Sequence, residues 1–208
     1  MDDAAGSATR RRLLVGGGAL ATTALLSACG ASSAAPSSTP GAAGSGGTAA
    51  GSGRSDWLYL VVLTGKMIGK PGFPQVLPAD FTVPAHTTIQ CEIRCLDDGA
   101  ATTPSGYEKV KGTVGGTITI VPLVDHLPSG KGQVVRALDP KKVAHTITMA
   151  DTGLNIPIPP LASVQFRFNS GAAGTHGWQC MAACGTGTGG WGGPMSTDGW
   201  MKGTMTVR

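Results

Sequence analysis

After residue 55 the chain alternates between short apolar runs of strand length and loops rich in glycine and proline. The alternation is strict over 88–96, where every second residue is apolar: Ile89, Cys91, Ile93 and Cys95. That period is typical of a half-buried strand. Further strands are predicted at 57–64, 117–121, 143–149, 164–168 and 201–207. No sustained helical period interrupts them, so the pattern predicts an all-β, antiparallel sandwich or barrel.

The first 29 residues predict an export signal. Arg10, Arg11 and Arg12 stand directly before an apolar run over 13–26, which is the order of a secretory signal. Residues 9–14 read Thr-Arg-Arg-Arg-Leu-Leu and resemble the twin-arginine consensus, with an ordinary Sec signal as the alternative. The apolar run is too short to span a bilayer comfortably.

Residues 26–29, Leu-Ser-Ala-Cys, resemble a lipobox, in which Cys29 takes a diacylglycerol and becomes the mature N-terminus. The whole segment resembles the signal of a bacterial, actinobacterial-like, twin-arginine lipoprotein. A plain secretory cleavage site beside a stray cysteine is the alternative. We therefore expect an extracytoplasmic protein that the lipid on Cys29 anchors to the cell membrane.

Two further regions follow the signal. Residues 30–55 contain almost only Gly, Ala, Ser, Thr and Pro, a composition that predicts a disordered linker. Residues 56–208 are enough for one domain with a core. The formal net charge is +4, and no basic run is interleaved with aromatic residues, so nucleic-acid binding has no support. No ordered motif of a hydrolase or transferase occurs either.

A cysteine pair carries the clearest chemical signal. Residues 180–185 read Cys-Met-Ala-Ala-Cys-Gly, in a glycine-rich stretch before the last predicted strand. Here the sequence resembles the cupredoxin family, and within it the periplasmic copper domain of cytochrome c oxidase subunit II, whose loop reads Cys, three residues, Cys-Gly, His, two residues and Met. The matching segments are Phe-Thr-Val-Pro-Ala-His at 81–86, Val-Ala-His-Thr at 143–146, Gly-Leu-Asn-Ile at 153–156 and Gly-Trp-Gln-Cys at 177–180. The resemblance implies a cupredoxin-like Greek-key sandwich.

The resemblance also implies a copper site. Its ligands in this chain would be His145, Cys180 and Cys184 with a methionine, either Met201 or Met195. We prefer Met201, because it stands where the family's methionine leads into the last strand. Thiolates and an imidazole hold copper in a fixed geometry, and a distant thioether tunes its potential.

One position departs from the family pattern. Thr188 stands four residues after Cys184, where the family has its second histidine. A dinuclear centre of the usual shape is therefore excluded, which leaves one copper ion or none. Since thiolate and thioether favour Cu(I), the loss of this imidazole favours copper handling over rapid electron transfer.

The cysteines have non-metal interpretations as well. Cys180 and Cys184 could close a disulfide if their Cα atoms come within about 7 Å. Cys91 and Cys95 lie four residues apart on one strand, roughly 13 Å, so they cannot bond to each other. We expect this second pair to be small buried hydrophobes.

The other histidines and the tryptophans carry weaker signals. His86 and His126 stand in predicted loops, where we expect them to be solvated, and a ligand role for His176 is a minority hypothesis. His145 shares its strand's apolar face and so needs a metal or a hydrogen-bond partner. Three tryptophans crowd the C-terminal segment, either as a hydrophobic cap or as a docking patch for a redox partner: Trp178, Trp191 and Trp200.

These observations lead to two functional hypotheses. The first is an extracytoplasmic, lipid-anchored cupredoxin-like protein that binds copper for electron transfer or copper handling, with a redox or copper-donor protein as partner. The second is a metal-free binding module of the cell envelope with a degenerate copper site. An independent oxidase is not expected, because one domain offers at most one incomplete site. Fold similarity does not decide between the two.

Overall fold

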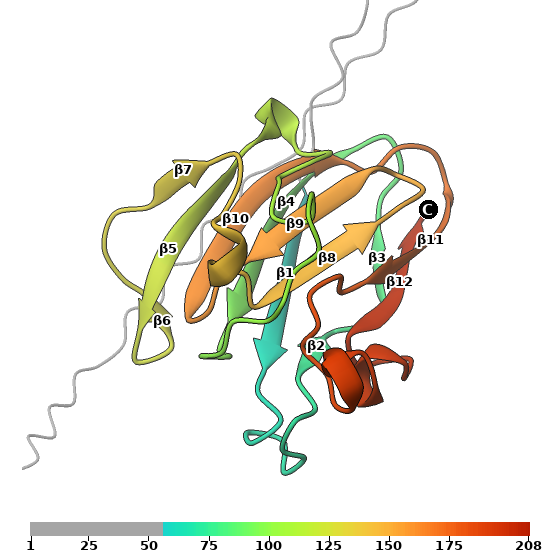
Figure 1. The fold of residues 1–208 in the computed structure, drawn as a ribbon. Helices are drawn as coiled ribbons and strands as arrows, with labels where there is room; N and C mark the ends of the chain where they lie inside the picture. The colour runs from blue at the N-terminus through green and yellow to red at the C-terminus, as the bar shows by residue number, and fades with distance from the viewer. Residues whose placement is uncertain (1–55) are drawn as a thin grey trace, which may run out of the picture. The chain divides into compact units, whose positions relative to one another are not determined.

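The computed structural model describes residues 56–208, which form two β-sheets (Figure 1). The predicted signal over 1–29, with Cys29, and the predicted linker over 30–55 lie outside the described residues. Residues 56–208 contain twelve strands, four short 3-10 helices and no α-helix. None of the helices in this part of the chain is long and apolar enough to cross a membrane.

The first sheet has seven strands in the order β2-β1-β4-β10-β5-β6, and β7 also pairs with β5. Its strands are β1 (Asp56–Leu63), β2 (Gln75–Leu77), β4 (Thr88–Cys95), β5 (Ile118–Val124), β6 (Leu127–Pro128), β7 (Gln133–Val135) and β10 (Ala162–Asn169). Strand β4 is central, since β1 pairs with one of its edges in parallel and β10 pairs with the other edge antiparallel.

The second sheet has five strands in the order β3-β12-β11-β8-β9. Its strands are β3 (Phe81–Val83), β8 (His145–Met149), β9 (Leu154–Ile158), β11 (Gly174–Gln179) and β12 (Lys202–Val207). Strands β12 and β3 pair in parallel, and the other pairs are antiparallel. The chain crosses between the sheets several times, so residues far apart in the sequence meet at the ends of the strands.

One hydrophobic core lies between the sheets. Ile93 of β4, Val164 of β10, Ile147 of β8 and Met205 of β12 are each at most 2% exposed and belong to one cluster. Full burial of such a side chain stabilises the fold by about 1.5–3 kcal/mol. The predicted all-β sandwich is therefore confirmed. The two parallel pairings were not foreseen, because side chains alternate in the same way in parallel and antiparallel strands.

Strand β4 follows the predicted alternation with one exception. Cys91, Ile93 and Cys95 point into the core as expected, but Glu92 is also buried, at 8% exposure. Its carboxylate accepts a hydrogen bond from Ser163 Oγ at 2.9 Å and pairs with Arg94 at 3.0 Å. A buried carboxylate needs hydrogen-bond or ion-pair partners, and Ser163 and Arg94 supply them to Glu92.

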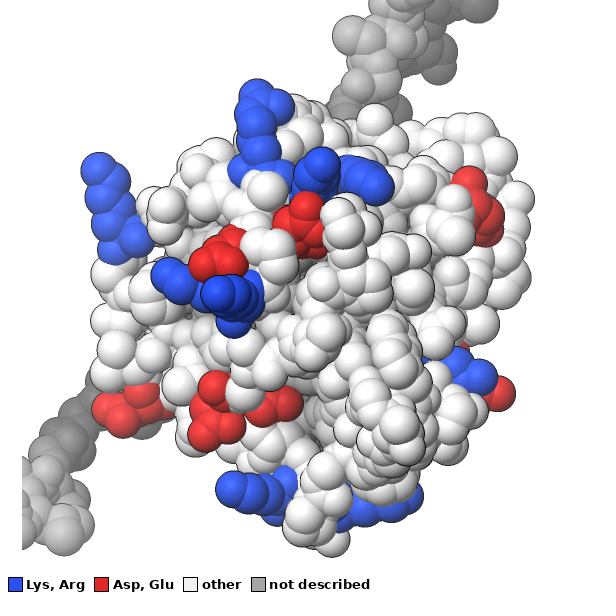
Figure 2. Space-filling view, in the orientation of Figure 1, with Lys and Arg blue, Asp and Glu red and all other residues white. Residues whose placement is uncertain are grey.

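Charged side chains are dispersed over the surface. Figure 2 shows Lys and Arg in small groups, separated by Asp and Glu, on one face of the described residues. This face carries no continuous basic area among residues 56–208.

Candidate metal centre

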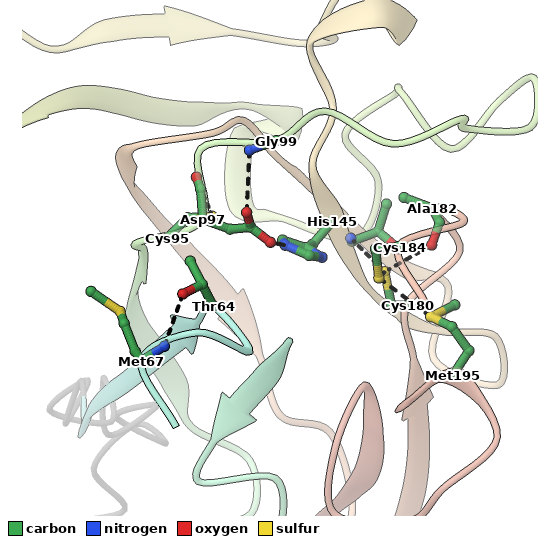
Figure 3. Close-up of polar contacts among 11 residues, drawn as sticks. Thr64, Met67, Cys95, Asp97, Gly99, His145, Cys180, Ala182, Cys184 and Met195 are labelled. Atoms are coloured by element: carbon green, nitrogen blue, oxygen red, sulfur yellow. Dashed lines mark hydrogen bonds and ion pairs between the residues drawn. The ribbon is translucent and has the colours of Figure 1, made fainter. Parts of the chain in front are cut away.

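Three potential ligands meet at one end of the sandwich. His145 is the first residue of β8, Cys180 directly follows β11, and Cys184 lies in the loop beyond. Their ligand atoms, one ring nitrogen and two sulfurs, all lie within 4.8 Å of one another. In Figure 3 the His145 ring lies between the Asp97 carboxylate and the two sulfurs. The structure thus brings together the three strongest candidates of the sequence.

Backbone groups hold the start of the cysteine loop against β8. Cys180 N–H donates to the carbonyl of Met201 at 2.9 Å, and Thr146 N–H donates to Cys180 Sγ at 3.3 Å. Met181 N–H donates to Thr146 Oγ1 at 2.7 Å. Since Thr146 directly follows His145, the same contacts fix the imidazole strand and the first thiol relative to each other.

The two thiols are free and in contact. Cys180 Sγ and Cys184 Sγ are 3.6 Å apart. Two thiolates that bind one ion tetrahedrally through bonds of ~2.3 Å are about 3.8 Å apart. The loop therefore presents the two sulfurs at a separation that suits a shared ion.

The methionines occupy different places. Met195 is 2% exposed, and Cys184 Sγ–H donates to its thioether sulfur at 3.3 Å. Met201 is fully buried and contacts Cys180 through its backbone carbonyl. Of the two, Met195 is the methionine whose sulfur the structure records against a cysteine, so the geometry favours it. Our preference for Met201 stays an untested prediction.

Thr188 lies outside the cluster. It is exposed and begins the short 3-10 helix η3 (Thr188–Gly190) in the loop between Cys184 and Met195. A backbone hydrogen bond from Gly185 to Gly190 at 2.7 Å closes that loop. The position of the family's second histidine is therefore turned to solvent, and the chain returns to the cluster at Met195.

Asp97 completes the site, and we did not predict it. One of its carboxylate oxygens lies 3.1 Å from His145 Nε2, and the other accepts from Gly99 N–H at 3.2 Å. The sequence does contain a signal, because Asp97 continues the inward series that ends at Cys95 on β4. An inward carboxylate needs a donor. This contact orients the His145 ring. Nε2–H donates to Asp97, so Nδ1 is the nitrogen that faces the cluster.

His145 Nδ1 is buried and has no hydrogen-bond partner among the described residues. A buried polar atom left without a partner costs about 1–3 kcal/mol. His145 itself is 1% exposed. A buried ring nitrogen without a hydrogen-bond partner, close to two sulfurs, is suited to bind a metal ion.

The ionisation of the three groups is coupled. Burial lowers the pKa of His145, but the Asp97 carboxylate and the neighbouring Cys180 outweigh it and raise that pKa to about 9. Burial raises the pKa of Cys180, yet the contact with Cys184 and the neighbouring charge of His145 outweigh it and hold that pKa well below its ordinary value. The Cys180 thiolate in turn raises the pKa of Cys184. These opposite directions favour Cys180 over Cys184 as the thiol that loses its proton first.

The donor set fits copper. Thiolate and thioether are ligands that select Cu(I), whereas thiolate and imidazole both suit zinc as well as copper. Zinc sites in proteins use Cys, His and carboxylate ligands, so the buried Met195 sulfur beside Cys184 favours copper over zinc. The unpartnered Nδ1 and the 3.6 Å separation of the sulfurs suit either metal, so the thioether is the observation that distinguishes them.

The other histidines and the second cysteine pair lie outside the cluster. His86 and His126 are exposed, as expected. His176 is not one of the grouped ligands and pairs with Asp151 at 2.7 Å. Cys91 and Cys95 are free and buried in the core, as predicted, and burial raises the pKa of both, that of Cys95 to about 12.

The tryptophans do not form a single cap. Trp178 is buried in the core, and its indole N–H donates to the carbonyl of Ala79 at 2.7 Å. Trp200 packs edge-on against Phe73, with ring centroids 5.5 Å apart. Trp191 is 42% exposed. Only Trp191 of the three thus offers an open aromatic surface.

Comparison with solved structures finds copper proteins. Auracyanin from Roseiflexus castenholzii matches over 74% of this chain and 98% of its own, at 16% identity and a TM-score of 0.33. Auracyanin A, a "blue" copper protein from Chloroflexus aurantiacus, matches over 73% and 98%, at 12% identity and a TM-score of 0.34. A multicopper oxidase from Campylobacter jejuni matches over 76% and 31%, at 11% identity and a TM-score of 0.37.

No protein-family model and no curated protein matches the sequence. At the identities and TM-scores of the solved structures, the matches assign no ligand or activity to this chain.

Proposed function

We propose that residues 56–208 form a cupredoxin-like domain that binds one copper ion, preferentially as Cu(I), for copper handling or electron transfer. One observation carries the proposal. The unpartnered Nδ1 of the buried His145 converges with two free thiols whose sulfurs are 3.6 Å apart. Because the cluster in the described part of the chain contains one imidazole and Thr188 is exposed, oxidised copper lacks a second nitrogen ligand within the cluster that would help to hold it.

Each residue has a distinct part in the proposed site. His145 Nδ1 and the sulfurs of Cys180 and Cys184 would hold the ion, and the Met195 thioether lies beside Cys184 as a weak fourth donor. Asp97 orients the imidazole through Nε2. Burial of His145 and Cys180 excludes water from the donor atoms. Bound copper would supply either one-electron redox chemistry or a cargo for transfer.

Metal titration tests the proposal. We expect the reduced domain to bind one Cu(I) more tightly than Cu(II) or Zn(II), measured anaerobically by competition with a coloured chelator. Cys180→Ser and His145→Ala should each weaken Cu(I) binding by at least about tenfold, which corresponds to 1.4 kcal/mol. The matched controls are Cys91→Ala and His176→Ala, which remove a thiol and an imidazole outside the cluster.

Wild-type affinity no greater than that of Cys180→Ser or His145→Ala would contradict copper binding. The alternative function would then apply, a metal-free binding module of the cell envelope, and the exposed Thr188 is the observation that favours it. Recovery of Cys180 and Cys184 as a disulfide in the protein purified from cells would support that alternative.

We further propose that the domain works outside the cytoplasm on a lipid anchor at Cys29. The twin-arginine pattern, the lipobox and the linker composition support this location. Cys29→Ala should release the protein from the membrane fraction, because the apolar run over 13–26 is too short to retain it. Retention of that variant in membranes would remove the lipoprotein proposal.

The export route has its own test. Replacement of Arg10, Arg11 and Arg12 by lysine should block export if the twin-arginine route is used. Unchanged export of this variant would indicate the Sec route. A redox or copper-donor protein at the membrane remains the proposed partner.

A further inference from the structure

The ligands of the proposed site differ sharply in their access to solvent. His145, Cys180 and Met195 are at most 2% exposed, whereas Cys184 is partly exposed. An ion that enters or leaves the cluster must exchange ligands, and an incoming ligand reaches first the donor that is open to solvent. Among the described residues of the cluster, that donor is Cys184.

Cys184 borders a surface pocket of about 380 Å³. The wall on the β4 side includes Asp97, whose carboxylate contacts His145. The pocket thus borders both Asp97, which supports the ring, and the partly exposed Cys184. A water molecule in the liquid takes about 30 Å³, so this space admits a small metal complex as well as a bare ion.

The chemistry of the pocket suits a soft cation. Six of its lining residues matter here: Lys66, Asp97, Asp98, His126, Leu161 and Cys184. Among the lining residues two aspartates stand against one lysine, so their formal charges sum to a negative balance, which favours cations. His126 adds an imidazole, a donor that binds copper.

His126 reaches this place through a tight turn. It lies between β5 and β6, which pair at Val124 and Leu127. Asp125 and His126 both have left-handed backbone angles, with φ of 50° and 65°. This is the two-residue turn that matches the twist of paired strands. The hairpin therefore brings an exposed imidazole to the pocket from a part of the chain far from the other site residues.

We infer that the pocket at Cys184 is the exchange port of the site, through which Cu(I) carried on a small soft ligand enters and leaves, with His126 as a transient ligand at the rim. The inference rests on the proposed function. In the exchange, the bond from copper to its carrier breaks and a bond from copper to Cys184 Sγ forms. The thiol proton passes to water in the pocket, the carrier leaves, and copper stays Cu(I), so no electron moves.

The test uses a substitution that narrows the port and leaves every proposed metal ligand unchanged. Leu161 lines the pocket, is 41% exposed and already has a left-handed φ of 45°. Leu161→Trp fills space there and keeps the backbone N–H that donates to the backbone carbonyl of Asp97. We would load reduced wild-type and variant chains with the Cu(I)–acetonitrile complex, then follow removal by excess bathocuproine disulfonate in a stopped-flow instrument.

We expect Leu161→Trp to slow both loading and removal about tenfold, the effect of a barrier raised by ~1.4 kcal/mol. A narrower port slows the entry and the exit of Cu(I) by the same factor, so the equilibrium affinity should not change. Val134→Trp is the control for bulk, since Val134 is 65% exposed on β7 and does not line this pocket. His126→Ala should slow loading, while His86→Ala, which removes an exposed histidine elsewhere, should not.

Two results would overturn the inference. The first leaves the proposed function standing, and the second contradicts it as well. If Cu(I) binds with the expected dependence on His145 and Cys180, but Leu161→Trp and His126→Ala exchange it at wild-type rates, the port lies elsewhere and the proposed function stands. If the wild-type chain binds no Cu(I), the proposed function and the port fail together. Circular dichroism of each variant establishes that its fold is retained.

Discussion

At the scale of single residues, the site depends on which nitrogen of His145 is left free. The ring has two chemically different nitrogens, and a hydrogen bond to one of them decides which remains as a ligand. Asp97 takes Nε2 at 3.1 Å, and Nδ1 then has no hydrogen-bond partner among residues 56–208. The sequence supplied the ring and the thiols as candidates. It could not supply the pairing, because the two residues lie 48 positions apart. Asp97 follows β4 of the first sheet, and His145 begins β8 of the second.

Asp97→Ala should weaken Cu(I) binding by about 10–100-fold, the usual loss when a residue supporting a metal ligand is removed. Without the carboxylate the ring can rotate or change tautomer. Asp97→Asn should restore most of the affinity, because the amide oxygen still accepts from Nε2–H. Chelator competition gives the affinity, and ¹⁵N NMR of the imidazole gives the tautomer.

The control for that experiment is Asp151→Ala. Asp151 makes the same kind of contact, at 2.7 Å, with His176 outside the cluster. Equal losses of affinity in the Asp97 and Asp151 variants would mean that Asp97 acts through general charge or stability and not through the ring.

A second residue-scale prediction separates the two methionines. Met195→Leu should weaken Cu(I) binding several-fold, up to about tenfold or 1.4 kcal/mol, because the thioether beside Cys184 is lost. Met201→Leu should leave the affinity unchanged, since its recorded contact with the loop is made by the backbone. Methionine-to-leucine exchanges conserve volume and usually cost less than about 1.5 kcal/mol of stability. The reverse ranking of the two affinities would restore Met201 as the thioether ligand.

At the scale of elements, strand content was more predictable than strand pairing. Period-two alternation over 88–96 and 164–168 located β4 and β10, because each buries one face more deeply than the other. Strand β11 was missed, since Gly174 and Gly177 weaken its strand signal. Its position decides the site nonetheless, because Cys180 follows it directly. The loop after Cys184 was foreseen only as glycine-rich, and its path back to Met195 depends on contacts that composition does not encode.

Gly185→Ala should disturb that loop. A Cβ on Gly185 would lie 2.7 Å from Met195 Cγ and 3.0 Å from the carbonyl oxygen of Gly190. Such a close approach requires the loop to shift, and overpacking of this kind costs about 1–3 kcal/mol. We expect a lower free energy of unfolding in denaturant titration, together with weaker Cu(I) binding as Met195 moves from Cys184.

Gly177→Ala is the matched control, because a Cβ there would have no atom within 4 Å. Wild-type stability and affinity in Gly185→Ala, with Gly177→Ala also unchanged, would show that the loop adapts freely and that Met195 needs no fixed position.

At the scale of the whole molecule, the site joins the two sheets. Asp97 lies just beyond the end of β4 in the first sheet, and His145 begins β8 in the second. The cysteine loop adds a third segment between β11 and β12. An ion held there would cross-link parts of the chain that meet only in the folded state. Copper should therefore stabilise global folding and not merely order the loop.

Cu(I) binding should raise the free energy of unfolding of the reduced domain by about 2.7 kcal/mol when free copper is held at 100 times its dissociation constant, provided that the unfolded chain binds it much less. Thermal or denaturant unfolding of the apo and copper-loaded forms, monitored through the buried Trp178, measures the difference. An excess of a Cu(I) chelator should reverse it. Cys180→Ser should gain about 1.4 kcal/mol or less at the same copper concentration, because its affinity is at least about tenfold lower. If hydrogen exchange instead showed copper protecting only residues near 180–195 while the global transition stayed fixed, the ion would order the loop without joining the sheets.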